Sequence, residues 1–428
     1  MIVALILILA LLLLMLGFEM LLVLGLPALV YKEAFYSTMP DLIIVQKILG
    51  GVDHVTLLAI PFFIFAANLM GSGQIARQLV AVVKALVGHT TGGMGHVVVG
   101  GSMAFGSVSG SAPATVAAMA KMVYPELRKA GYSERFSLGL IVSSAEVALL
   151  IPPSITMIVY GWMTGTSIAQ LFAAGLAVGL VLGLAFAIYV VIVARRDGVE
   201  RYPRAGWGAR LALMWEAKWA LGMPAIILGG IYSGTLTATE AAAASVVYAI
   251  VIELVVLRSL NLNDMFRITE QSAINTCIIF VLLAMGGLVS YFVTLGQVPN
   301  QIIDFIEAQD AGWISFLLVV NVLFLMMGMF IDPNSAMLIL VPPLYPVAMA
   351  LGIDPVHFGM ILTLNISLGM ITPPFGLDIF VASSTLGKPV STIISGVGPF
   401  VVVNLIVLLF ITYIPDISLF VPRLVFGG

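Results

Sequence analysis

Small and hydroxyl-bearing residues gather inside a long apolar stretch, in the segment GSVSGSAPAT at residues 106–115. Hydroxyls, and carbonyls freed where a helix breaks, are oxygen ligands that suit a hard monovalent cation, while the helix N-terminus after Pro113 offers N–H donors to an anion. Close helix packing through small residues is the alternative interpretation. The binding candidates are Ser107, Ser109, Gly110, Ser111 and Thr115.

A second polar segment, MFIDPNSAML, places Asp332, Asn334 and Ser335 in apolar sequence. A carboxylate deep in such sequence is costly, which makes it a candidate for function. Asp and Asn also cap helix N-termini by accepting hydrogen bonds from backbone N–H groups that lack a partner, so capping is the alternative role. One residue can do both.

Two Pro-Pro dipeptides, Pro152-Pro153 and Pro373-Pro374, lie near the middle of apolar stretches long enough to cross a bilayer. Proline breaks a helix, and in lipid the freed N–H and C=O groups are tolerated only where protein or a watery cavity surrounds them. Two such breaks at matching places predict a binding site at the membrane midplane, built by two related halves as in secondary transporters. The polar residues beside the breaks are Ser154, Thr156, Thr372 and Asp378.

Three further acids, Glu19, Glu146 and Glu240, fall in or beside apolar sequence. Each could accept a proton, pair across helices or extend its head group to the membrane surface. The sequence has no HExxH, no GxSxG and no P-loop lysine, and its single cysteine, Cys277, allows no intrachain disulfide. We therefore expect a protein that is not an enzyme.

The composition is that of a polytopic α-helical membrane protein. Of the 428 residues, 61% are hydrophobic and 9% charged, and the mean hydropathy is +1.15, so most side chains must face lipid or other helices. A net charge of −3, with charges confined to short connections, argues against a nucleic-acid partner. The N-terminal run lacks the basic start and cleavage site of a signal peptide, so we predict a retained, tilted helix over 1–30.

Apolar runs long enough to cross a membrane recur along the chain. They cover residues 1–30, 53–71, 138–165, 168–194, 219–236, 238–257, 273–296, 357–386 and 391–414. Two other apolar stretches, 92–127 and 313–351, are each interrupted by a small polar turn, so we expect both to be re-entrant helical hairpins. Amphipathic arms are expected at 74–88 and 297–310.

The two halves of the chain repeat one another. An offset of 221 residues aligns the two Pro-Pro pairs, and also Tyr124-Pro125 with Tyr345-Pro346, without a gap. Lysine and arginine, which collect in cytoplasmic loops, place the connection 195–218 inside. Threading the spans outward from it opens the two hairpins to opposite sides of the membrane, which predicts inverted repeats.

The predicted domains follow from this threading. They are scaffold helices and the first arm over 1–91, the first repeat of a transport unit over 92–194, a cytoplasmic connection over 195–218, scaffold helices and the second arm over 219–312, the second repeat of the transport unit over 313–414, and a C-terminal tail over 415–428. Each repeat contains one hairpin and one broken helix.

The sequence resembles the large membrane subunit of the TRAP transporters, the tripartite ATP-independent periplasmic carriers. The resemblance rests on AFGSVSGSAPATVAAM, SSAEVALLIPPS, GMFIDPNSAMLILVPPLYPV and LNISLGMITPPFGLDIFV, and it covers essentially the whole chain. It implies an elevator-type carrier of the bacterial inner membrane, with a fold like that of the ion transporter superfamily, that imports an organic acid with Na⁺. C4-dicarboxylates and sialic acid are both open as substrates. A periplasmic substrate-binding protein would deliver the acid, and a separate small four-helix membrane subunit would brace the scaffold.

The resemblance also implies two sodium sites and a substrate site. One sodium would be bound at Ser107, Ser109, Gly110, Ser111 and Pro152, and the other at Asp332, Asn334, Ser335, Thr372 and Pro373. The substrate carboxylate would lie near Ser111, Thr115, Ser154 and Asn334. Glu19 departs from the expected pattern, in which a proline is common. A sodium- or proton-coupled carboxylate carrier without a binding protein is the alternative function, and an ion channel is a third.

Overall fold

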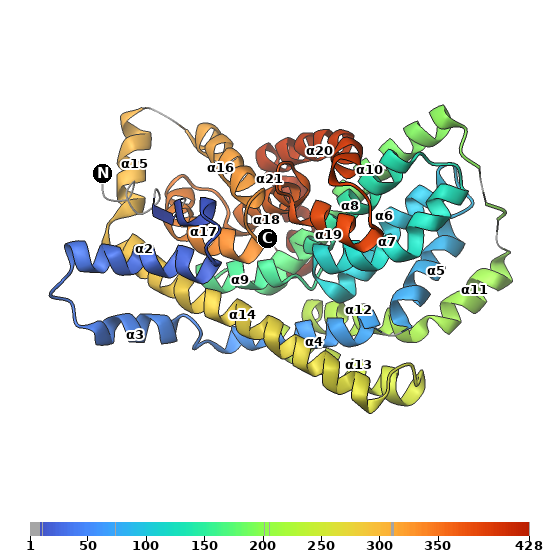
Figure 1. The fold of residues 1–428 in the computed structure, drawn as a ribbon, viewed down its shortest axis with the longest axis horizontal. Helices are drawn as coiled ribbons and strands as arrows, with labels where there is room; N and C mark the ends of the chain where they lie inside the picture. The colour runs from blue at the N-terminus through green and yellow to red at the C-terminus, as the bar shows by residue number, and fades with distance from the viewer. Residues whose placement is uncertain are drawn as a thin grey trace.

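The computed structural model describes residues 9–10, 12–72, 74–200, 202–204, 206–309 and 312–427. These residues form helices and no β-strand, as Figure 1 shows. The prediction of an all-α fold is confirmed.

The N-terminal region differs from the prediction of one helix over 1–30. A short helical stretch ends at residue 15, and Gly17 then adopts φ 77°, a left-handed conformation that glycine accepts without steric cost. Helix α2 (Met20–Phe35) starts after this turn, with Glu19 at its N-cap position. A further helix that was not predicted, α3 (Asp41–Gly50), follows. The first part of the predicted helix, residues 1–8 and residue 11, lies outside the described residues.

The first half of the chain then forms the predicted series of a span, an arm, a hairpin, a broken helix and a span. Its elements are the 3-10 turn η1 (Val55–Leu58) and α4 (Ala59–Ser72), α5 (Ile75–Val87), α6 (Gly93–Ser109), α7 (Ala112–Lys129), α8 (Glu134–Glu146), η2 (Val147–Leu149), α9 (Ile155–Thr164) and α10 (Ile168–Asp197). The arm is α5, the hairpin is α6–α7, and the broken helix is α8–α9.

The same series recurs after the connection. The intervening elements are α11 (Trp207–Glu216), α12 (Lys218–Tyr232) and α13 (Ala238–Ile250), which ends in the π-helical turn η3 (Val251–Val256). The second series is α14 (Leu262–Leu295), α15 (Val298–Ala308), α16 (Trp313–Gly328), α17 (Pro333–Ala350), α18 (Pro355–Ile371), α19 (Leu377–Leu386), α20 (Val390–Tyr413) and α21 (Pro415–Phe426). The stretch predicted as a C-terminal tail thus holds α21, which packs against α10.

The continuous helices are long enough to cross a membrane, whereas the helices that end or begin at a break are shorter. Within the described residues, five helices are long and apolar enough to cross a membrane: Val55–Ser72, Ile168–Asp197, Ala238–Val256, Leu262–Leu295 and Val390–Tyr413. The pair α11 and α12 would add a sixth, bent by 66°. Helices α9, α18 and α19 are shorter because each ends or begins at a Pro-Pro break.

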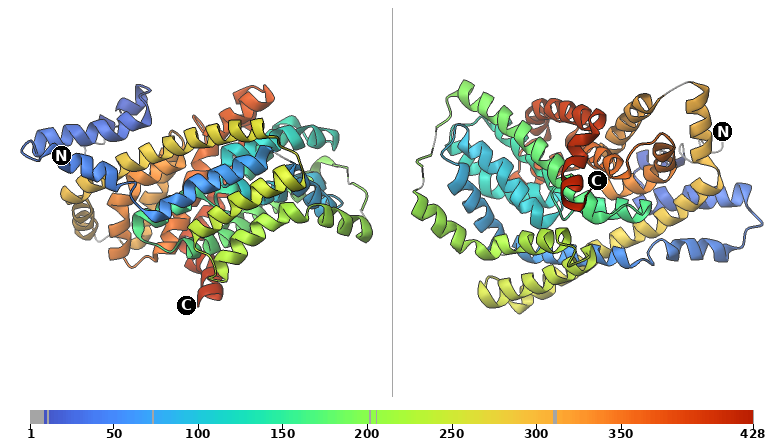
Figure 2. Two further views of the ribbon diagram at one scale, coloured as in Figure 1. Left: turned by 90° about the horizontal axis from the view of Figure 1, so that it is seen from below. Right: turned by 180° about the vertical axis from the view of Figure 1, so that it is seen from behind.

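Two groups of helices make up the molecule. Helices α4, α13 and α14 lie side by side in Figures 1 and 2, with α2 and α3 along α14. The hairpins and broken helices form the other group around α8, α18 and α20. Helices α8 and α20 come especially close, since a Cβ atom on Gly139 would collide with the carbonyl oxygen of Gly396. Close backbone approach at small residues is typical of helix packing in membranes.

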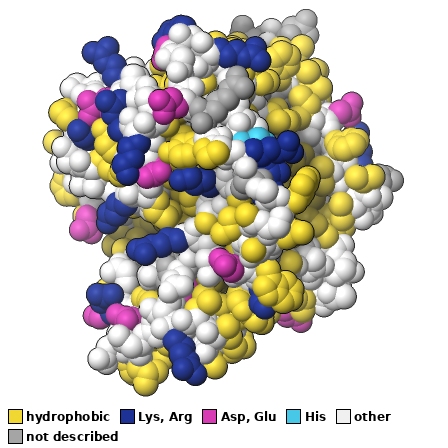
Figure 3. Space-filling model, turned by 90° about the vertical axis from the view of Figure 1, so that its right-hand side faces the viewer, with side chains coloured by type: hydrophobic (Ala, Val, Ile, Leu, Met, Phe, Trp, Pro, Cys, Tyr) yellow, Lys and Arg dark blue, Asp and Glu magenta, His cyan; other side chains and the backbone are white. Residues whose placement is uncertain are grey.

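Basic side chains gather at one end of the molecule. Figure 3 shows many Lys and Arg side chains on the face made by the end where α5, α10 and α11 lie in Figure 1. This is the end that carries the connection between α10 and α12, which the sequence places in the cytoplasm.

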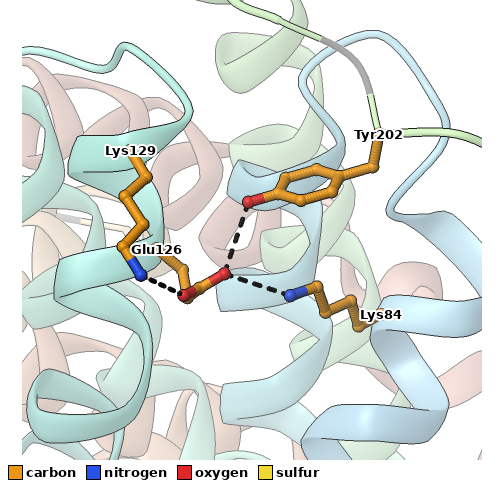
Figure 4. A network of polar contacts seen from close by, with 4 residues as sticks. All are labelled: Lys84, Glu126, Lys129 and Tyr202. Carbon is orange, nitrogen blue, oxygen red and sulfur yellow. Dashed lines mark hydrogen bonds and ion pairs between the residues drawn. The ribbon is translucent and has the colours of Figure 1, made fainter.

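A polar network on this end joins three parts of the chain (Figure 4). Glu126 on α7 pairs with Lys84 on the arm α5 (Nζ to Oε2, 3.1 Å) and with Lys129 (Nζ to Oε1, 3.3 Å). The hydroxyl of Tyr202, from the connection, donates to Glu126 Oε2 at 3.3 Å. The hydrogen bond from Lys84 lowers the pKa of the Glu126 carboxyl below its ordinary value, because it favours the ionised form. The network therefore ties the first hairpin to its arm at neutral pH.

The orientation can be tested by labelling single cysteines in intact cells, after the exposed Cys277 is replaced by alanine. We expect Arg204→Cys to react only from the cytoplasm and Glu307→Cys, on the second arm, only from the periplasm, because basic residues mark the inside. Periplasmic labelling of Arg204→Cys would contradict this orientation, and labelling of both positions from the same side would contradict the inverted-repeat topology. Two other informative positions, Arg201 and Asp310, lie outside the described residues.

The Glu126 network gives a second prediction. Glu126→Gln should raise amide hydrogen exchange in α5 by up to about fivefold, because a partly exposed ion pair contributes roughly 0.2–1 kcal/mol. A folded-state carboxyl pKa below the ordinary value gives a stabilisation that is present at neutral pH and lost only as the pH falls through that lowered pKa. The protection of the α5 amides from hydrogen exchange that the ion pair provides should thus be independent of pH around neutrality.

The matched control is Glu134→Gln, which removes the ion pair of Glu134 with Lys388 (2.7 Å). That pair joins α8 to the α19–α20 connection and does not involve α5, so exchange in α5 should stay unchanged. Equal exchange of α5 in the parent and in Glu126→Gln would show that the network does not hold the arm.

Candidate functional site

The first hairpin tip is a short break between α6 and α7. Gly110 ends α6 with φ 57°, and Ser111 occupies the N-cap of α7, where its hydroxyl accepts from the N–H of Ala114 at 3.5 Å. The hydroxyls of Ser109 and Thr115 are 3.0 Å apart, and Thr115 Oγ1 donates to the Ser111 carbonyl at 2.8 Å. The tip is therefore a compact turn rich in oxygen atoms.

Glycine is required where this tip meets the first broken helix. The left-handed φ of Gly110 is costly for other residues, and a Cβ atom there would also collide with the carbonyl oxygen of Pro153. The peptide bonds Pro152–Pro153 and Pro373–Pro374 are both cis. The structure thus brings the first tip against the first break, as the proposed sodium ligands of that half require.

The second tip is built around Asp332, which caps α17. Its carboxylate accepts from the N–H of Ser335 (3.1 Å) and from the Ser335 hydroxyl (2.6 Å). The capping role foreseen for Asp332 is present, and the residue also lines the cavity described below. Capping therefore does not remove Asp332 from the candidate site.

The second tip adjoins the second break in the same way. The rings of Phe330 and Phe375 lie 5.3 Å apart between centroids, and a Cβ atom on Gly328 would lie 3.1 Å from the Cα of Gly369. Thr372 ends α18, and its hydroxyl donates to the carbonyl of Leu368 at 2.6 Å.

The two halves meet between the breaks. Thr156, at the start of α9, donates to Asn334 Oδ1 on α17 at 3.5 Å. Ala112, Leu149 and Met370 form a small buried cluster that joins the first tip to both broken helices. One site is thereby assembled from residues of both repeats.

A cavity of about 660 Å³ lies at this meeting point. The tips contribute Ser109, Gly110, Ser111, Asp332 and Asn334 to its lining. The opposite wall belongs to α4 and α14, where Ile64 and Ile278 are apolar and Asn68 and Asn275 are polar. Lys121 on α7 also lines the cavity, so an anion and a monovalent cation would both find suitable partners there.

The other predicted site residues lie behind this lining. Thr115, Ser154 and Ser335 are each 0% exposed, and Pro152 is also buried. Ser107 is buried and donates to the carbonyl of Ala104 at 2.7 Å. Ser154 Oγ has no hydrogen-bond partner among the described residues, which suits a further ligand. Thr372 and Pro373 lie at the second break, next to the lining residue Met370.

Several lining residues were not among the predicted ligands. Asn68 and Asn275 face the tips from the scaffold, and Asn68 Nδ2 also donates to Ser272 Oγ at 2.8 Å. In the sequence, each of these asparagines is a single polar residue in an apolar helix. Residues that only pack against other helices show the same pattern. Thr156 was noted beside the first break without a role as a ligand, and Lys121 was not among the predicted site residues.

The three additional acids differ in their surroundings. Glu19 is exposed. Glu240 is part of a capping box with Thr237 at the start of α13, since it accepts from the Thr237 N–H at 2.8 Å. Glu146 is 0% exposed at the end of α8. Of these three, only Glu146 remains a candidate for proton binding inside the membrane.

The fold is similar to that of a solved transporter. The YdaH transporter of Alcanivorax borkumensis, described as having an unusual topology, superposes with a TM-score of 0.64 at 15% sequence identity, over 90% of this chain and 88% of that one. This likeness concerns the fold alone.

Sequence comparisons identify the family. Residues 6–417 match the tripartite ATP-independent periplasmic transporter, DctM component. The ectoine TRAP transporter large permease TeaC of Halomonas elongata is 40% identical over 97% of both chains. The C4-dicarboxylate large permease DctM of Pseudomonas aeruginosa is 39% identical over 88% of both. The sialic acid large permease SiaM of Vibrio cholerae is 37% identical over 89% of this chain and 90% of its own.

These relatives are permease subunits and not enzymes, and they place the chain in the inner membrane as an integral protein. The chain belongs to the DctM family, the large permease subunits of TRAP transporters.

Proposed function

We propose that this permease subunit imports an organic acid together with sodium by an elevator-type movement, after a periplasmic binding protein delivers the acid. The observation that carries the proposal is the single cavity lined by both hairpin tips. A small four-helix membrane subunit would brace the scaffold helices. No P-loop lysine occurs in the sequence, so this chain does not hydrolyse ATP by that route, and we propose that an ion gradient drives import.

Sodium suits the chemistry of the tips. The first tip supplies hydroxyl and carbonyl oxygens without a charge, and the second adds the carboxylate of Asp332. Bound sodium ions would offset that carboxylate and attract the anionic group of the substrate, an attraction that is stronger in a site of low dielectric constant than in water. The proposed residues of the two sodium sites and of the substrate site are those named from the sequence. Of the substrate residues, Ser111 and Asn334 line the cavity, whereas Thr115 and Ser154 lie behind its lining.

An organic acid is the substrate class that the relatives support. Ectoine, C4-dicarboxylates and sialic acid, which name three of the relatives, all carry a carboxylate group. The N–H groups at the start of α7, after Ser111, would receive such a group, and Lys121 adds a cation at the same cavity. The apolar wall of α4 and α14 is a surface along which a unit that carries both tips could slide.

The driving force can be tested on the reconstituted three-component complex. Uptake should need a sodium gradient and no ATP, and it should respond to membrane potential wherever sodium charge exceeds substrate charge, since one charge gains about 2.3 kcal/mol per 100 mV. If a proton gradient instead drives uptake in sodium-free buffer and without the binding protein, the result would favour the alternative function, a proton-coupled carboxylate carrier that works without a binding protein. Substrate flux that continues without any gradient of its own or of an ion would contradict both.

The site can be tested with Ser111→Ala and Asp332→Asn. Both should raise the sodium concentration for half-maximal uptake, because each removes an oxygen ligand or its charge. Asn remains a good helix cap, so Asp332→Asn should change thermal stability little, whereas Asp332→Ala also loses the cap and about 0.5–2 kcal/mol.

Asp354→Asn is the matched control for this site. Asp354 caps α18 by accepting from the N–H groups of Val356 and His357, and it does not line the cavity. Its substitution should leave sodium dependence unchanged. If Ser111→Ala and Asp332→Asn also leave that dependence unchanged, these side chains are not sodium ligands.

A further inference from the structure

Three polar side chains lie on neighbouring helices within the group formed by the hairpins and broken helices, called here the moving unit. Glu146 ends α8, Asp378 lies in the first turn of α19, and Asn404 lies in α20; each is 0% exposed. The three helices pack against one another. Asn404 Nδ2 donates to Glu146 Oε1, and Asp378 lies at the start of α19, which packs against both α8 and α20.

This group lies next to the cavity without lining it. Leu149, three residues after Glu146, and Leu377, the residue before Asp378, are both lining residues. The two acids are therefore placed behind the cavity wall. They are distinct from the proposed sodium ligands, which lie at the tips and at the Pro-Pro breaks.

Hydrogen-bond acceptors outnumber donors in this group. Glu146 Oε2, both carboxylate oxygens of Asp378 and Asn404 Oδ1 have no partner among the described residues. A buried, ionised carboxylate without a partner is costly, and a second carboxylate nearby adds repulsion. The group therefore lacks a positively charged species.

No basic side chain supplies that charge. The ionisable residues on α8 and on the helices packed against α8 and α19 are His96 on α6, Lys121, Tyr124, Glu126, Arg128 and Lys129 on α7, Glu134 and Arg135 on α8, His357 on α18 and Tyr413 on α20. In the described part of the chain, none of them forms a hydrogen bond or ion pair with Glu146 or Asp378. From α20, the neutral side chain of Asn404 donates a hydrogen bond to Glu146.

We propose that Glu146 and Asp378 form a carboxyl pair that binds a proton and carries it with the moving unit, so that import takes up a proton in addition to sodium. The inference rests on the proposed function, since it requires a unit that moves between the two sides of the membrane. A proton provides the donor that the free acceptors lack. A divalent metal ion would need more ligands of this kind, and no group of three His, Cys, Asp or Glu residues that could hold one occurs in the described ranges.

Neighbouring hydroxyl groups provide the first step of proton entry. The side chains of Ser143 and Ser144, on the turn of α8 before Glu146, are buried and have no hydrogen-bond partner among the residues that the structure describes. Hydroxyl groups both donate and accept, so they can pass a proton to a carboxylate.

The test measures sodium-driven uptake by the reconstituted complex at saturating sodium, from about pH 5 to about pH 9. In the parent, uptake should depend on pH, with a change of up to about tenfold per pH unit on the limb where one proton is lost. Import should also acidify the lumen, as a trapped pH-sensitive dye would report. In Glu146→Gln and Asp378→Asn, which mimic protonated acids, both effects should disappear while uptake still requires sodium.

Glu253→Gln is the matched control. Glu253 is an equally buried acid, 0% exposed, but it belongs to the turn after α13 and accepts from Ser259 Oγ. It should keep the parent's pH profile and lumen acidification. Glu126 is excluded as a source of the profile, because its lowered pKa places its titration on the acidic side of its ordinary value.

Other results would overturn the proposal. An identical pH profile in the parent and both variants, without lumen acidification, would show two permanently protonated acids with a structural role. A change in sodium stoichiometry at an unchanged pH profile would assign the pair to sodium. Loss of all sodium-driven uptake in the parent would instead refute the proposed function. If the variants do not fold, infrared spectra of the parent complex still decide: the absence of a carboxyl band that titrates between acidic and alkaline pH would refute proton binding.

Discussion

The architecture depends on the need to satisfy backbone polar groups where helices break inside the membrane. Each Pro-Pro pair and each hairpin tip frees N–H and C=O groups that lipid cannot hydrate. The structure places each tip against a break, through Gly110 beside Pro153 in one half and Gly328 beside Gly369 in the other. The freed groups then face protein and a common cavity, where they can also serve as ligands. The breaks that would destabilise a simple helix bundle thus create the cavity of the candidate binding site.

Close backbone contact in turn limits which residues the unit can contain. Gly139 and Gly396 allow α8 and α20 to approach at their backbones, and this contact joins the broken helix of the first half to the last long helix of the second. On the scaffold side, by contrast, the cavity wall consists largely of apolar side chains with two asparagines. A tightly packed unit beside a mainly apolar wall is a physical arrangement in which one part can move as a rigid body, because few polar contacts must be broken.

The sequence predicts the helix breaks and their polar residues well, because polar groups in apolar runs are rare and costly. Asp332 and Ser111 were found in this way. Side-chain direction could not be predicted: Thr115 follows Ser111 by one helical turn, and its hydroxyl bonds back to the Ser111 carbonyl and does not line the cavity. Asn68 and Asn275 were missed because one amide in a long apolar helix resembles a packing residue. The turn at Gly17 escaped notice because the hydrophobic run continues on both sides of it.

The net charge of the moving unit depends both on the groups at the cavity and on the two acids behind its wall. A unit that crosses a medium of low dielectric constant moves most easily when its bound charges nearly cancel. In the proposed function, sodium ions would offset Asp332 and an anionic substrate at the tips. Glu146 and Asp378 are buried apart from those sites, among α8, α19 and α20. Those two acids need their own compensation within the same unit. The physical requirement that favours sodium at the tips in the proposed function therefore also favours a second positive species behind the cavity wall.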